Sequence, residues 1–161
     1  MIISNTFKVI IVLLLVNTIS IAQAQSQHAP QIFNAAIKED LAAYKSLNLD
    51  DTHPNLLDPA IAKSDHQKVI ASWTDLHKSI GEFLGQQNFS WDNEGKSVSI
   101  WQKIYFNPNG KVTHYFYHIS NPEISAEKKK EFGKLVSDYV SGFGIAITRP
   151  EQFAQCGKTK Y

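Results

Sequence analysis

Apolar residues between Pro30 and Leu49 recur three and four residues apart, which is the spacing of one face of an α-helix. Pro30 suits a first helical turn, where the missing amide hydrogen of proline costs nothing. The pattern predicts an amphipathic helix from Pro30 to Leu49, followed by turn formers at residues 50–55. Its apolar stripe is Phe33, Ala36, Ile37, Leu41, Tyr44 and Leu47.

A second helix is predicted after Ser64. The hydroxyl of Ser64 can cap the first turn while Gln67 reaches back, which is the spacing of a capping box. Gly85 is placed for a left-handed residue at the C-terminal end. Both helices are amphipathic, so each must bury one face. The stripe of the second helix is Val69, Trp73, Leu76, Ile80 and Phe83, with Ile70 and Leu84 beside it.

The pattern changes to β-strands after residue 97. Residues 98–106 and 111–119 flank Asn107-Pro108-Asn109-Gly110, a sequence typical of a hairpin turn in which Gly110 adopts a positive φ. A third helix is predicted from a Ser125 cap to Gly142, then a strand over residues 143–148, and the tail is expected to end in a short strand. The predicted class is α+β: an N-terminal helical pair over residues 30–86, then a β-β-α-β part over residues 97–161 with a mainly antiparallel sheet.

The hairpin offers the most informative candidate site. If Asn107 lies opposite Lys111, strict alternation places four aromatic residues on one face of the sheet. Two interpretations of this face are open. Either the two N-terminal helices cover this face and complete a three-layer core, or part of it stays open as an aromatic platform for a ligand, most exposed near the turn at Tyr105 and Tyr115. The candidate ligand-binding residues are Trp101, Tyr105, Tyr115 and Tyr117.

The N-terminus predicts export. Lys8 precedes an apolar run that ends at Ala22-Gln23-Ala24, the layout of a secretory signal with a small-residue cleavage site. Residues 1–24 are therefore expected to be removed, which leaves residues 25–161 as one α+β domain. Asn17, Thr18 and Ser20 interrupt the run, so we expect no membrane span after processing. The mature protein is predicted to be periplasmic or secreted.

The charge balance narrows the classes of partner. Lys8 is the only charged residue among the first 24, so the mature chain carries 15 Lys and Arg against 15 Asp and Glu. A balanced chain with one arginine, Arg149, does not suit nucleic acid, whose recognition relies on guanidinium contacts. The expected partner is a periplasmic or cell-envelope protein, or a small ligand.

Cys156 is the candidate reactive thiol, because it is the only cysteine and cannot form an intramolecular disulfide. A packed apolar residue, an intermolecular disulfide and a nucleophile beside a histidine are the alternatives for it. His114 and His118 lie in one predicted strand, roughly 13 Å apart, which is too far for one metal ion. No Gly-rich phosphate loop is present. We therefore expect no metal and no cofactor.

Residues 97–161 resemble a known family. The segment from Lys103 to Thr113, KIYFNPNGKVT, followed by a Glu- and Lys-rich helix and a final strand, is similar to the C-terminal domain of TonB-type energy transducers. The element from Phe153 to Gly157, FAQCG, is similar to the ends of small exported proteins of Bacteroidetes-type bacteria. The resemblance implies a fold and a periplasmic protein-binding role by strand addition. It does not imply energy transduction, which needs an uncleaved anchor and a Pro-rich spacer.

The sequence thus favours a non-catalytic binding or protein-interaction module that acts through the aromatic face or a sheet edge. The alternative is a small exported hydrolase or thiol enzyme that uses Cys156 or a histidine. The two are distinguished by whether the Cys156 thiol and a histidine lie within hydrogen-bond reach.

Overall fold

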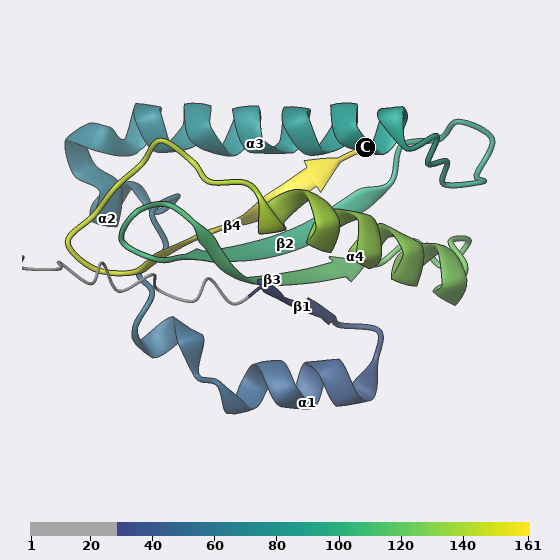
Figure 1. Cartoon of the computed structure of the whole chain (residues 1–161), viewed down its shortest axis with the longest axis horizontal. Coiled ribbons are helices and arrows are strands. Elements are labelled where there is room, and N and C mark those ends of the chain that lie inside the picture. The colour runs from purple at the N-terminus through teal and green to yellow at the C-terminus, as the bar shows by residue number, and fades with distance from the viewer. Residues whose placement is uncertain (1–28) are drawn as a thin grey trace, which may run out of the picture.

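The computed structural model describes residues 29–161, so the expected signal peptide at 1–24 lies outside the described residues (Figure 1). Four strands form one sheet in the order β1-β3-β2-β4. β1 is parallel to β3, whereas β2 is antiparallel to both β3 and β4. The fold is therefore α+β with a mixed sheet. The elements are β1 (Gln31–Asn34), α1 (Lys38–Ser46), α2 (Pro59–Ala62), α3 (His66–Gln86), β2 (Ser99–Phe106), β3 (Val112–Ile119), α4 (Ala126–Ser141) and β4 (Phe153–Lys160), with short 3₁₀ turns at Leu49–Asp51 and Lys63–Asp65.

The helix expected from Pro30 to Leu49 is instead a strand and a shorter helix. Phe33 lies in β1 opposite Phe116 and is only 6% exposed, whereas α1 has no buried residue. Between them the Asn34 side chain accepts a hydrogen bond from the Ala36 amide at 3.0 Å. The apolar residues that suggested one helix therefore belong to two elements, β1 and α1. Burial of Phe33 in the sheet outweighed its place in a helical stripe, because tertiary contacts override a weak local preference.

The longer helices occur where the pattern predicted them, although one cap differs. Ser125 accepts a hydrogen bond from the Lys128 amide at 3.1 Å and caps α4 as expected. Ser64 does not cap α3; it lies within the 3₁₀ turn, and α3 begins after Asp65 without a side-chain cap. At the other end Asn88, with φ of 55°, adopts the left-handed conformation expected for Gly85.

The hairpin contains a β-bulge that the sequence pattern did not reveal. Tyr105 pairs with His114 but Phe106 pairs with Val112, so Thr113 is an extra residue in β3. Its hydroxyl donates to the Tyr105 carbonyl at 3.2 Å. A bulge of one residue reverses the direction of every side chain beyond it relative to the partner strand.

The bulge separates the four aromatic residues that were expected to share a face. The first face of β2 and β3 carries Ile100, Gln102, Ile104, Phe106, Val112, Tyr115, Tyr117 and Ile119. The second face carries Trp101, Lys103, Tyr105, His114, Phe116 and His118. The expectation of one Trp/Tyr face is therefore corrected: Tyr115 and Tyr117 lie on the first face, and Trp101 and Tyr105 on the second.

The helices divide between the two faces. α3 and α4 cover the first face. On the second face, the Tyr44 ring of α1 stacks on Phe116, with the ring centroids 4.1 Å apart. Figure 1 shows α1 and α3 on opposite sides of the sheet, so the two N-terminal helices do not cover one face together, as the three-layer interpretation required. Three layers result, and within residues 29–161 α1 is the one helix on the second face. The core beneath α3 and α4 includes Val69, Leu76, Ile80, Leu84, Phe132, Val136 and Val140 together with the apolar residues of the first face.

The C-terminal strand lies later in the chain than the pattern indicated. Residues 143–148 do not form a strand; they cross the hairpin tip, where the Ile145 amide donates to the Gly110 carbonyl at 2.9 Å. Gly110 has φ of 76°, and a Cβ there would lie 2.6 Å from the Ile147 carbonyl oxygen, so no side chain fits. β4 then pairs with β2 along its whole length.

Within residues 29–161, no helix has the length and apolar character to cross a membrane.

Candidate binding surface on the second face of the sheet

One end of the second face is covered by residues 48–56, which we call the arch. The arch is fixed to the start of β4: the Leu56 amide donates to the Ala154 carbonyl at 2.8 Å, and the Ala154 amide donates to the Pro54 carbonyl at 3.0 Å. The side-chain oxygen of Asn55 accepts from the Cys156 amide at 3.1 Å. These bonds occupy the outer side of β4 only as far as Cys156.

A polar network fixes the arch to the sheet. The Tyr105 hydroxyl donates to the Asp50 carboxylate at 2.7 Å, and Lys103 Nζ lies 2.5 Å from the same oxygen. The hydroxyls of Tyr44 and Tyr105 are 2.6 Å apart. Burial raises the pKa of Tyr105, and its bonds to Tyr44 and Asp50 raise it further. Burial also acts to raise the pKa of Asp50, but the bonds from Lys103 and Tyr105 outweigh it and lower that pKa. The network therefore holds Asp50 ionised and the phenols neutral.

Three of the four predicted ligand-binding aromatics are buried. Tyr105 is inaccessible beneath the arch, and Tyr115 is inaccessible on the first face. Tyr117 is 2% exposed and donates its hydroxyl to the Lys129 carbonyl at 2.8 Å. Only Trp101, at 38%, is exposed. The structure thus leaves a single candidate from that set at the surface.

Trp101 is the centre of a row of exposed side chains that crosses three strands. Lys158 of β4 and His118 of β3 lie directly opposite it in the register, and both are exposed on the second face. We call Lys158, Trp101 and His118 the open row. The Trp101 ring meets Phe116 edge to face, with centroids 5.7 Å apart, which fixes the indole on the sheet.

Cys156 lies between the arch and the open row. It is half-buried opposite Lys103, and burial raises its thiol pKa while the charge of Lys103 acts in the opposite direction. Within the described part of the chain no hydrogen bond joins this thiol to a histidine. A raised pKa keeps the sulfur in its less reactive thiol form.

Among residues 29–161, no group of three or more His, Cys, Asp or Glu side chains is arranged to hold a metal ion.

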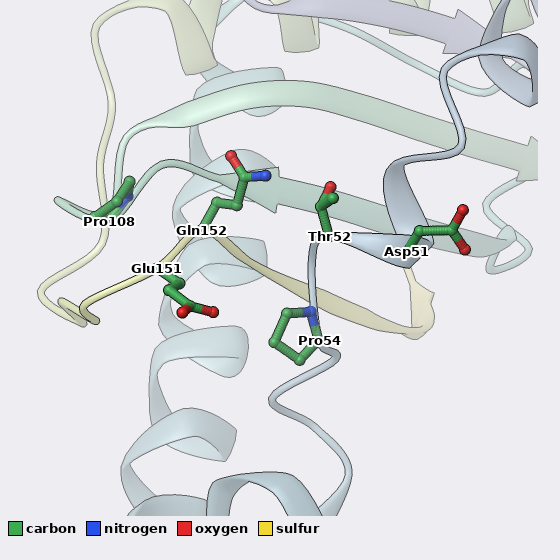
Figure 2. Close-up of a pocket in the computed structure, with 6 residues that line it drawn as sticks. All are labelled: Asp51, Thr52, Pro54, Pro108, Glu151 and Gln152. Atoms are coloured by element: carbon green, nitrogen blue, oxygen red, sulfur yellow. The ribbon is translucent and has the colours of Figure 1, made fainter.

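A hollow of about 510 Å³ lies on the other side of the arch (Figure 2). Its polar side chains do not converge: Figure 2 shows the Asp51 carboxylate pointing away from Glu151. A small-molecule site needs a few convergent polar groups, so the hollow is a weaker candidate than the open row. It is lined by Asp51, Thr52, Pro54, Pro108, Glu151 and Gln152.

Sequence reasoning identified Trp101 but missed the two residues beside it. Lys158 and His118 join Trp101 only through the register of three strands, and His118 reaches this face only because of the bulge. The Asp50–Lys103 pair was missed as well, since 53 positions separate its members and no local pattern links them.

Comparison of the chain with protein-family models, with curated proteins and with solved structures gives no match.

Proposed function

We propose that the mature protein is an exported, non-catalytic interaction module that binds an extended segment of a cell-envelope protein across the open row and along the edge of β4. The observation that carries this proposal is the exposed Trp101, held in place on a sheet face that is covered elsewhere. The predicted signal at residues 1–24 supports the compartment, and the resemblance of residues 97–161 to the TonB C-terminal domain agrees with a protein-binding role.

The open row has the features of a small interaction centre. Tryptophan is enriched among residues that contribute most to binding, because it offers a large apolar area with a polar N–H. The contact with Phe116 already restrains the indole, so binding loses little side-chain freedom. Lys158 and His118 supply the polar rim that commonly surrounds such a residue.

The edge of β4 beside the open row has unpaired backbone groups. Tyr161 exchanges both backbone bonds with Val98, and antiparallel pairing repeats at every second residue, so Thr159 and Gly157 also face β2. The amides and carbonyls of Lys158 and Lys160 therefore point away from β2. Within residues 29–161 they have no hydrogen-bond partner. Unpaired edge groups are a template for an added strand.

The thiol-enzyme alternative has less support. A nucleophilic cysteine needs a lowered pKa or an adjacent base, whereas burial raises the pKa of Cys156. Its backbone amide also donates a hydrogen bond to the Asn55 side chain of the arch. These features favour a structural role for Cys156 at the junction of the arch and β4.

Photocrosslinking in the exporting host tests the proposal. Trp101→benzoylphenylalanine should give a discrete crosslinked species, because the probe lies where the partner binds. The matched control is Ile70→benzoylphenylalanine, since Ile70 is also 38% exposed but lies on α3 in the opposite layer. The same species from both positions, or none from Trp101, would contradict the proposal.

A matched pair of substitutions at Lys158 tests strand pairing in the same assay. Lys158→Ala and Lys158→Pro both remove the charge, but only the proline removes the outward amide hydrogen. The Trp101 crosslink should persist in the alanine variant and be lost in the proline variant. An unfolding midpoint for each variant shows that the sheet is intact. Equal crosslinking in the two variants would exclude pairing through this amide.

A further inference from the structure

Two lysines of β4 form a positive stripe along the unpaired edge. Lys158 and Lys160 are exposed, and neither forms an ion pair with another residue of the described chain. Because side chains alternate along a strand, both ammonium groups project from the second face, roughly 6–7 Å apart along β4. The stripe therefore carries positive charge at alternate positions.

Within residues 29–161, no carboxylate forms an ion pair with either lysine of this stripe. Asp50 of the arch, which covers the other end of the same face, is engaged by Lys103 at 2.5 Å and by the Tyr105 hydroxyl. Lysines on an edge strand also repel the same edge of a second copy of the chain. The edge of β4 is thus unfavourable for self-pairing and favourable for a strand of opposite charge.

We propose that the partner segment is an extended chain that carries carboxylates at alternate positions, and that these lie opposite Lys158 and Lys160. A strand added beside β4 would lie about 4.8 Å away, and its alternate side chains would share the second face with the two lysines. This inference rests on the proposed function, because it specifies the segment that pairs with β4. It goes further by fixing the charge pattern of that segment.

Three synthetic peptides test the charge pattern. One alternates Glu with Thr and Val, one has the same composition with the Glu residues in a block, and one alternates Lys in place of Glu. Binding is followed through the amide signals of Lys158 and Lys160 in the labelled mature protein. The alternating Glu peptide should bind about fivefold or more tightly than the other two, and added salt should weaken it.

Variants of the protein complete the test. Lys158→Ala and Lys160→Ala should each weaken binding of the alternating Glu peptide about two- to fivefold. Lys130→Ala is the matched control, since Lys130 is exposed on α4 and has no ion pair within the described residues; it should bind as the parent does. Equal binding of the three peptides, or equal losses in all three variants, would overturn the inference. The Trp101 crosslink would then still decide the proposed function independently.

Discussion

Replacing Tyr115 with alanine should lower the free energy of unfolding by roughly 3–5 kcal/mol, whereas Trp101→Ala should lower it by about 1–2 kcal/mol. Tyr115 is fully buried on the first face, in the core that α3 and α4 cover. Trp101 is 38% exposed and rests on Phe116 alone among the aromatic residues. Removal of a ring from the interior leaves a cavity, while removal from a surface row leaves a gap that water fills.

Denaturant unfolding of the two variants side by side checks this difference. Conservative changes to the hydroxyls supply the control. Tyr117→Phe removes a bond to the Lys129 carbonyl and should cost about 1 kcal/mol. The Tyr115 hydroxyl has no hydrogen-bond partner among residues 29–161, so Tyr115→Phe should be neutral or slightly stabilising. If Trp101→Ala proves as damaging as Tyr115→Ala, the second face is not open at Trp101.

Acid should destabilise the protein through His77 by as much as about 5 kcal/mol. His77 lies on the buried side of α3 and is 8% exposed, its Nδ1 is 2.7 Å from the Tyr161 hydroxyl, and burial lowers its pKa to about 3. An unfolded histidine titrates near 6.5, so between pH 6.5 and 3 only the unfolded state binds the proton. His77 therefore costs no stability above pH 6.5. Below that pH it lowers the free energy of unfolding by about 1.4 kcal/mol per pH unit.

Urea unfolding of the parent and of His77→Gln at several pH values between 7 and 4 measures this contribution. Burial also lowers the pKa of His53 and His114, but both proteins share those groups, so the difference between the two curves belongs to His77. As the pH falls, the free energy of unfolding of the parent should approach that of His77→Gln. Parallel curves for the parent and His77→Gln would show that His77 is not buried as a neutral imidazole.

The parts of the fold that the sequence predicted are those with strong local signals. The Asn107–Gly110 turn and the Ser125 cap appear where their chemistry requires them, and α3 follows its apolar stripe. β1 was missed because four residues, parallel to a strand some 80 positions later, leave no periodic trace. β4 was displaced because residues 143–148 are apolar for a different reason: they cover the hairpin tip.

The candidate site was only partly predictable because its membership depends on register. One extra residue, Thr113, moved Tyr115 and Tyr117 into the core and brought His118 to the face of Trp101. Threonine fits either a regular strand or a bulge, so the sequence pattern could not distinguish them. The arch raises the same difficulty, since its hold on Tyr105 depends on Asp50 meeting Lys103 across the fold.

Amide hydrogen exchange along β4 tests most directly whether the edge beside the open row is unpaired. The amides of Gly157 and Thr159, which face β2, should exchange slowly, and the Cys156 amide should be protected by Asn55. The Lys158 amide, between two protected neighbours in mid-strand, should exchange much faster because it points away from β2. Slow exchange at Lys158, comparable with that at Thr159, would mean that the edge is already occupied and would contradict strand addition at this site.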